Sequence, residues 1–326
     1  MIVRAITYLL RGFSLLVAVV IVAFSLAVSA PIDPVQSYIG SGTAISPEQR
    51  ENIIEYWGLD EPPIERFTKW LNHAFHGDLG TSMTYRQDVG DVIGEKFIES
   101  IVLMVVAWLL AGVLGIVIGL VMGAYSHHWL GRVLKSICYT LTAVPSFYLG
   151  ILLLLIFAVY LSWFPIGLAT PIGLLNSEVS VMDRIQHMIL PALCLSMVSM
   201  PAIALHTRAK LIEALHSDYA QYARARGESE KSVILRHCLR NSILPAAMLQ
   251  FASFSELFGG SVLVEQVFSY PGLGNAAVRA GTNGDIPLLL GITIFSALFV
   301  FIGNALGDLF INLADPRIRL GRDRNG

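Results

Sequence analysis

Three polar side chains recur at every third position inside an apolar stretch of the chain: Gln250, Ser253 and Glu256. This spacing is expected to place them on one face of a helix, and Gly260 continues the stripe. A carboxylate at membrane depth costs roughly 2.5–3.5 kcal/mol, so it should face a cavity or a partner. The stripe therefore predicts the lining of a translocation path, with a structural hydrogen bond between helices as the alternative. Glu265, near the end of the same stretch, is expected to be solvated.

The sequence lacks the motifs of the common enzyme classes. It contains no Gly-Lys pair, which excludes a Walker A phosphate loop, and neither a His-Glu-x-x-His nor a Gly-x-Ser-x-Gly motif. Ser253 and Glu256 do not form a recognisable nucleophile–base arrangement. We therefore predict no catalytic residue and no metal or cofactor bound by this chain, and we expect it not to be an enzyme.

The composition is that of a polytopic membrane protein. Of the 326 residues, 55% are hydrophobic and 14% charged, against roughly 25% charged in ordinary soluble domains. The net charge of −2 gives no global basic field, so we expect membrane lipid and not nucleic acid as a partner. Because a helix needs about 20 apolar residues to cross a bilayer, we predict six transmembrane helices. They lie at about 12–30, 101–124, 137–162, 187–205, 243–264 and 287–313.

The distribution of Lys and Arg predicts the orientation, and the predicted spans divide the chain into segments. Seven basic residues lie between the fourth and fifth spans, whereas the long segment 31–100 carries five bases and twelve acids. The positive-inside rule then puts both termini in the cytoplasm. We expect an N-terminal segment with the first span (1–30), which is too long for a signal h-region and is retained. An external helical subdomain (31–100) and a transmembrane domain (101–326) with a cytoplasmic loop at 206–242 follow.

The cytoplasmic loop carries the signals of a short helix. Asp218 is expected to be its N-cap, with Gln221 as the capping-box partner three residues later. Gly227 is expected to end the helix in the left-handed conformation. A helix of about two turns is marginal alone in water, so other contacts should hold it. A second helix should follow, capped by Ser229 and ending near residue 240, before the chain re-enters the membrane at 243–245.

Glycine and proline predict how the spans pack. Gly115, Gly119 and Gly123 recur at four-residue spacing, which lets helices approach closely in lipid. We expect this stripe to pack within one subunit, with a dimer seam as the alternative. Pro145 is expected to kink the third span.

The loop contains an acidic residue, an Ala-x-Ala-x-Gly run and a basic helix that ends in Arg-Asn-Ser-Ile-Leu-Pro. In these features it resembles the cytoplasmic coupling loop of ABC importer permeases. The nearest subgroup is the dipeptide/oligopeptide/nickel permease family. Four further blocks resemble that family in the same order and extend over nearly the whole chain: 77–82, 144–150, 265–274 and 315–319. The resemblance implies that one set of loop residues couples to an ATPase: Asp218, Tyr219, Ala223, Arg224, Ala225 and Gly227.

The resemblance also implies the fold, the partners and the mechanism. The chain is expected to be an all-α, type I ABC importer-like permease in a bacterial inner membrane. It would work with a second homologous permease, two ATPase subunits that use ATP and magnesium, and an external solute-binding protein, by alternating access. The substrate stays open among dipeptides, oligopeptides, glutathione-like peptides, nickel and metal chelates. A gradient-driven transporter or channel is the alternative function, but it leaves the capped loop helices unexplained. A membrane scaffold without transport would not need the polar stripe.

Overall fold

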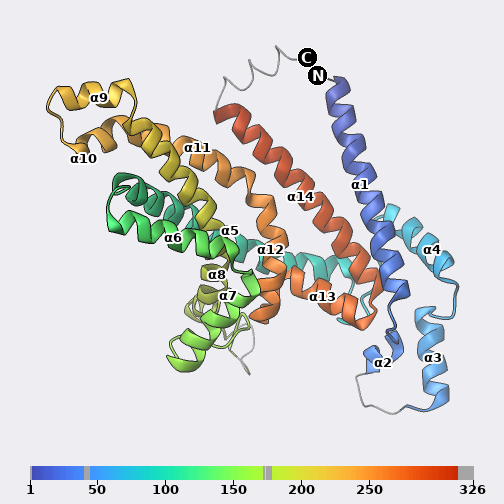
Figure 1. Cartoon of the computed structure of the whole chain (residues 1–326). Coiled ribbons are helices and arrows are strands. Elements are labelled where there is room, and N and C mark those ends of the chain that lie inside the picture. Colours follow the sequence, from blue (N-terminus) through green and yellow to red (C-terminus); the bar gives the residue numbers. More distant parts are fainter. Residues whose placement is uncertain (1, 40–44, 172, 174–177, 315–326) are drawn as a thin grey trace. The chain divides into compact units, whose positions relative to one another are not determined.

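The computed structural model of the chain describes residues 2–39, 45–171, 173 and 178–314. It divides into two compact units. Unit 1 contains Met1–Ser100 and Pro271–Phe301, and unit 2 contains Ile101–Tyr270 and Ile302–Gly326. Two long helices, α5 (Val89–Ala124) and α14 (Ile286–Ala314), contribute residues to both units (Figure 1). The predicted division into 1–30, 31–100 and 101–326 stays a prediction.

Unit 1 is built from one long helix and several short ones. Its complete helices are α1 (Ile2–Ser29), α2 (Pro34–Ile39), α3 (Pro47–Trp57), α4 (Pro63–Phe75) and α13 (Leu273–Asn283). A capping box starts α3, because Ser46 accepts from the backbone of Gln49 and the Gln49 side chain accepts from the backbone of Ser46. Gly58 ends α3 with a φ of 59°, which glycine adopts without a Cβ penalty.

A buried carboxylate ties the loop that follows the 77–82 block to the start of α14. Asp285 is 1% exposed, and its Oδ2 accepts from the Ser82 hydroxyl at 2.6 Å and from the Thr84 amide at 2.9 Å. Its Oδ1 accepts from the Leu288 amide at 3.3 Å, as an N-cap of α14 does. The Asp285 carboxylate therefore accepts hydrogen bonds from the first turn of α14 and from residues 82 and 84, and it holds these two segments together.

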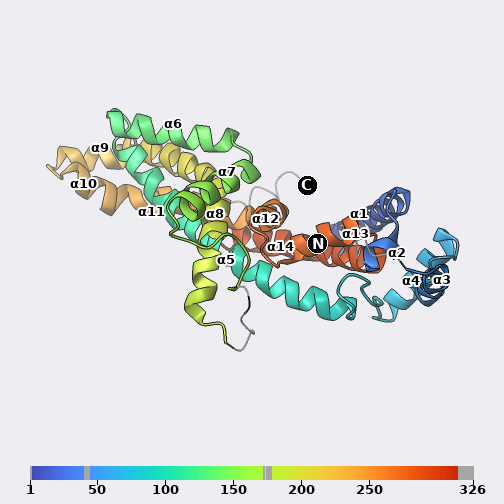
Figure 2. The same cartoon turned by 90° about the horizontal axis from the view of Figure 1, so that it is seen from below.

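Unit 2 is organised around α8 (Val181–Leu215), which packs against several neighbours (Figure 2). The other complete elements are α6 (Trp129–Ala143), α7 (Ser146–Leu153), the π-helix η1 (Leu154–Tyr160), α9 (Asp218–Ala225), α10 (Glu230–Val233), the π-helix η2 (Ile234–Cys238), α11 (Leu239–Ala252) and α12 (Phe254–Val267). The glycine stripe of α5 packs directly on α8. A Cβ added at Gly119 would overlap Thr207, so close packing within the chain is confirmed there.

Within the residues that the structure describes, four helices are long and apolar enough to cross a membrane, or up to six if each of two bent pairs is one span. The four lie at Leu10–Ser29, Val89–Ala124, Val181–Leu215 and Ile286–Gly307. The third and fifth predicted spans are not straight helices, since they bend by 112° between α6 and α7 and by 58° between α11 and α12. Pro145 causes the first bend, because Pro disfavours the helical region for the residue before it, and Val144 is extended with a ψ of 125°.

The prediction that Glu265 is solvated is wrong. Its side chain is completely buried in unit 2. The chain turns back just after it: the Tyr270 amide donates to the Glu265 carbonyl at 2.8 Å, and the Phe268 carbonyl accepts from the Leu168 amide at 2.8 Å. The fold therefore buries a position that the linear sequence suggests is open to solvent.

Candidate functional site

The short helix α9 begins one residue earlier than predicted. Its N-cap is Ser217, with φ −73° and ψ 157°, and Asp218 is the first helical residue. The capping box predicted for Asp218 and Gln221 is therefore wrong, and the Gln221 side chain donates to the His216 carbonyl at 3.1 Å instead. The Asp218 carboxylate is exposed in the first turn, where it interacts favourably with the positive end of the helix dipole.

The buried face of α9 consists of alanines. Ala220 and Ala223 are 0% and 3% exposed and join a small core with Leu211, Val233 and Cys238. The small side chains let α9 lie close to α8 and η2. Ala223, predicted as a coupling residue, therefore contacts its own chain, so any effect that it has on a partner is indirect.

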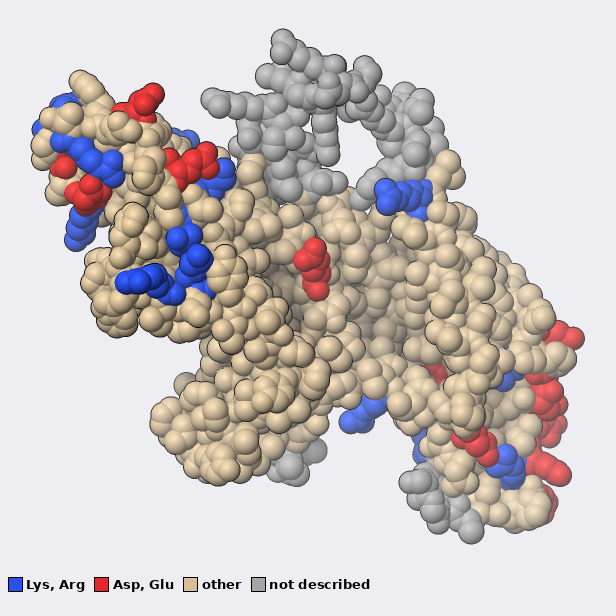
Figure 3. All heavy atoms as spheres, in the orientation of Figure 1, with Lys and Arg blue, Asp and Glu red and all other residues tan. Residues whose placement is uncertain are grey.

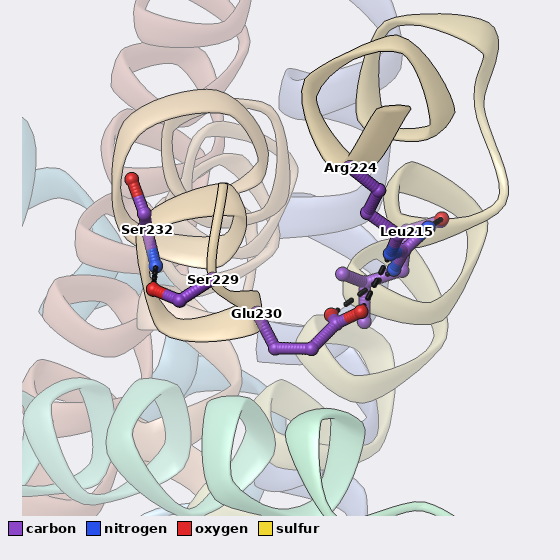
Figure 4. A network of polar contacts seen from close by, with 5 residues as sticks. All are labelled: Leu215, Arg224, Ser229, Glu230 and Ser232. Carbon is purple, nitrogen blue, oxygen red and sulfur yellow. Dashed lines mark hydrogen bonds and ion pairs between the residues drawn. The ribbon is translucent and has the colours of Figure 1, made fainter. Parts of the chain in front are cut away.

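Arg224 fixes α9 to the two helices that flank it. Its Nε and Nη2 donate to the Glu230 carboxylate at 2.6 and 3.1 Å, and its Nη1 donates to the Leu215 carbonyl at 2.8 Å (Figure 4). The hydrogen bond to Glu230 raises the pKa of the Arg224 guanidinium. One planar side chain thus joins the end of α8, α9 and the start of α10, which supplies the support that so short a helix needs.

The turn after α9 has the predicted left-handed glycine. Gly227 has a φ of +84°, and a Cβ there would meet nothing within 4 Å. Ser229 caps α10 by accepting from the Ser232 amide at 3.4 Å. Glu228 accepts from the Ser232 hydroxyl at 2.8 Å and lies 3.2 Å from His237 Nε2, and these contacts lower the pKa of the Glu228 carboxyl.

The second helix does not end near residue 240 as predicted. It continues from α10 through the π-helical turn η2 into α11 and ends at Ala252. The tyrosine at the start of α9 is tied to this continuous helix, because the Tyr219 hydroxyl accepts from the Asn241 side chain at 3.1 Å. The loop 206–242 is therefore largely helical and is part of unit 2.

The outward face of α9 is aromatic and charged. Tyr219 and Tyr222 are 40% and 66% exposed, and Asp218, Ala225 and Arg226 are exposed beside them. In Figure 3 charged side chains of both signs gather at the end of unit 2 that α9 and α10 form, next to an uncharged surface. Half-exposed tyrosines among charges are typical of protein–protein contact surfaces.

The polar stripe is divided by the bend between α11 and α12. Ser253 and Glu256 lie with Ser146 and Ser199 in the wall of a groove of about 320 Å³, whose remaining walls are mostly aliphatic. Among the described residues that line it, Glu256 is the sole charged one. The expectation that all three stripe residues share one face of a straight helix is wrong, because the helix breaks at Ser253.

Gln250 is buried in a contact between α11 and α5. Its Nε2 donates to the Trp108 carbonyl at 2.6 Å, and the Trp108 indole Nε1 donates to the Gln250 carbonyl at 3.0 Å. The Trp108 ring also packs edge-on against Phe251 and Phe254, on either side of the bend. This geometry matches the structural alternative for Gln250, whereas Ser253 and Glu256 face the groove.

Sequence reasoning missed two residues that shape these regions, Trp108 and Asp285. Asp285 carries a readable signal, since Asp-Ile-Pro after a glycine is a helix start with Pro in the first turn. Trp108 carries no such signal, because its partner lies 142 positions away in the chain.

Apolar helices long enough to span a membrane, a short loop helix held by Arg224 and a polar groove are the features that the resemblance to transport permeases predicts. The family model described as "Binding-protein-dependent transport system inner membrane component" matches residues 115–320, and the chain belongs to this family. The family that the ordered motifs predicted is thereby confirmed. The chain is a permease component of an ABC importer and not an enzyme, and it functions in a complex with ATPase and binding-protein partners. The block 315–319 lies outside the described residues.

Similar proteins extend over almost the whole chain. The chain is 32% identical to the oligopeptide transport system permease protein AppB of Bacillus subtilis (strain 168), over 95% of this chain and 96% of that one. It is 34% identical, over the same shares, to a putative peptide transport system permease protein of Brucella abortus (strain 2308). The glutathione transport system permease protein GsiC of Escherichia coli O6:H1 is 32% identical over 89% of this chain and 90% of that one. A crystal structure of an amino acid ABC transporter with histidines covers 68% of this chain and 93% of that one at 16% identity, with a TM-score of 0.47.

Proposed function

We propose that this permease carries peptides and pairs with a second, homologous permease to enclose the path. The similar proteins named above are described as oligopeptide, peptide and glutathione permeases, which supports a peptide over nickel or a metal chelate. An external solute-binding protein would deliver the peptide. Two ATPase subunits would bind ATP and magnesium, and this chain would bind no cofactor.

The outward face of α9 is the proposed ATPase contact, and the fixation of α9 by Arg224 carries this proposal. Hydrogen bonds join α9 to α8, α10 and, through Tyr219, α11. A helix held in this way can transmit the motion of an ATPase to the rest of unit 2 as a rigid element. Its free face offers Tyr219, Tyr222 and Asp218. Ala223, Arg224 and Gly227 would then act as positioning residues that hold this face in place.

The groove beside α12 is the proposed part of the translocation path. Hydroxyls on three elements and one carboxylate are suited to a peptide with a positively charged amino end. Ser253 and Glu256 would contact the passing peptide, and Gln250 would hold the bend that presents them.

The family description supports a bacterial inner-membrane location, and the Lys and Arg distribution supports an orientation with both termini and α9 in the cytoplasm. All three native cysteines are buried and should react little with a thiol reagent, so labelling would come from the single introduced cysteine. A membrane-impermeant thiol reagent applied to intact cells should label Glu51→Cys on α3 at once and Ala225→Cys only after permeabilisation. The opposite pattern would reverse the proposed orientation.

The ATPase contact is tested by replacing Tyr222 on α9 and, as a control, Tyr56 on α3. Tyr222→Ala should leave membrane insertion and pairing with the second permease intact but lose ATPase subunits on detergent purification, or retain them without stimulated ATP hydrolysis. Tyr56→Ala, at a 79% exposed position on α3, is the matched control and should behave as wild type. Wild-type ATPase retention and stimulation in the Tyr222 variant would reject the proposed contact.

A further inference from the structure

Two adjoining hollows on unit 1 are not explained by coupling or by the translocation path. The first is an apolar groove of about 370 Å³ between α1, α4 and α14, and every residue that lines it is apolar. Its walls include Phe13, Val17, Ile21, Leu71, Phe75 and Leu298. The second is a pocket of about 190 Å³ near the C-terminal end of α1, and Phe67 lines both. The two hollows together form one site with an apolar part and a polar end.

The polar end presents hydrogen-bond donors that have no acceptor. The indole Nε1 of Trp57 is buried and makes no hydrogen bond with the described residues. The guanidinium of Arg66 makes no hydrogen bond with them either; it is attracted electrostatically to Glu61 and Asp60, and burial lowers its pKa. Glu61, the carboxylate in the pocket wall, is already paired with Lys69 at 2.5 Å. A ligand with acceptor oxygens would satisfy the buried Trp57 indole and give the Arg66 guanidinium a hydrogen-bond partner.

The helix between the hollows has the composition of a membrane-surface helix. Charged residues Glu65, Arg66 and Lys69 lie on α4 together with a row of large apolar side chains. None of its residues is buried, and Ile64 and Phe75 are 75% and 77% exposed. Apolar exposure of this size on an amphipathic helix is stable where lipid covers it.

The site matches one membrane leaflet in length. From Phe13 in the groove to Val28 in the pocket, α1 rises about 22 Å at roughly 1.5 Å per residue. Half of the bilayer hydrocarbon core is about 15 Å, and the headgroup layer adds several ångströms. An acyl chain in the groove would therefore bring its phosphate to the pocket that holds Trp57 and Arg66.

We propose that unit 1 holds a membrane phospholipid, with an acyl chain in the groove and the phosphate accepting hydrogen bonds from Arg66 and the Trp57 indole. A phosphodiester supplies acceptor oxygens for the Trp57 indole and the Arg66 guanidinium, and Arg matches phosphate geometry with two parallel N–H donors. The lipid would join α1, which is little buried along its apolar length, to α4 and α14. This inference rests on membrane placement and not on the substrate or on the ATPase contact.

The test measures lipid retention by the assembled transporter. The complex is reconstituted in vesicles of phosphatidylethanolamine and phosphatidylglycerol and re-extracted in a maltoside detergent, and the bound phospholipid is counted by native mass spectrometry. At least one phospholipid per copy of this chain should remain with wild type. Arg66→Ala should lower retention about tenfold through loss of a charge-assisted hydrogen bond. Leu71→Trp, which fills the groove, should do the same without changing a charge.

Arg50→Ala is the matched control, because Arg50 is an exposed arginine of unit 1 that pairs with Asp33 at 2.8 Å outside the site. It should retain lipid as wild type does. Arg66→Gln replaces Arg66→Ala if the alanine variant does not assemble. The proposal would be overturned by wild type without bound phospholipid or by wild-type retention in the Arg66 or Leu71 variants. A cross-link from Leu71→Cys to a helix of the second permease would also overturn it.

Discussion

Arg224 and Glu230 lie on two different short helices and are joined by two parallel hydrogen bonds, at 2.6 and 3.1 Å. The third contact of the same guanidinium reaches the Leu215 carbonyl at the end of α8. Arg224 is the member of the Ala-x-Ala-x-Gly segment that holds the loop together, while the tyrosines beside it stay accessible. The segment that resembles the family motif therefore contains two kinds of residue. Arg224 holds the helix in place, and the tyrosines face outward.

Arg224→Lys should loosen α9 although it keeps the charge. A lysine cannot make the fork to Glu230 and the bond to the Leu215 carbonyl together. Because the ion pair is partly exposed, we expect a loss of about 1–2 kcal/mol in the local opening free energy of α9. Amide hydrogen exchange over residues 218–225 measures this loss, and Arg226→Lys on the exposed side serves as the control. Unchanged protection in Arg224→Lys would contradict the role of the fork.

Gly227→Val should strain the turn and nothing else. No atom lies within 4 Å of the position of an added Cβ, so the cost comes from the φ of +84° alone. That conformation costs a residue with a Cβ roughly 1–2 kcal/mol. Transport and the exchange protection of 226–233 should fall together, whereas Gly227→Asn should lose less, since asparagine tolerates the left-handed region. Equal effects of Val and Asn would mean that the turn is not the cause.

Acid should loosen the turn between α9 and α10 through Glu228. The Ser232 hydroxyl and then His237 hold the pKa of Glu228 below its usual value of 4.5. A carboxyl whose pKa is lower in the folded state stabilises that state above the unfolded pKa, and the stabilisation is lost as the pH falls through the folded pKa. Exchange protection of 228–233, corrected for the intrinsic rate, should therefore decrease below about pH 4.5. Glu228→Gln should remove that pH dependence, and an unchanged profile would refute the assignment.

Glu256→Gln should lower uptake while the complex assembles normally. The substitution keeps the side-chain shape and removes the charge from the groove. Gln250→Leu is the contrasting variant, because it breaks the reciprocal bonds with Trp108 and should lower stability by about 1–3 kcal/mol. Uptake per assembled complex and the melting temperature separate the two effects. Normal uptake by assembled Glu256→Gln would exclude a path role for this carboxylate.

The sequence alone predicted much of the local structure. A left-handed Gly227, the Ser229 cap, the bend at Pro145 and the close-packing glycine stripe all depend on short-range backbone and steric rules that act within a few residues. The family was also predictable, because five ordered blocks identify it without any knowledge of packing.

The sequence determined which segments are helices and which family the chain belongs to; the tertiary structure decided which side chains face inward. Ala223 is buried, Glu265 is enclosed by the returning chain, and Gln250 pairs with a tryptophan on another helix. Each outcome depends on tertiary packing, which hydrophobic periodicity does not report; the Trp108 partner of Gln250 lies 142 positions away. The break at Ser253 has the same origin, because Trp108 packs against both sides of the bend. Local rules determine individual caps and turns, such as Ser229 and Gly227, whereas long-range packing determines what each helix face contacts and where the Ser253 break lies.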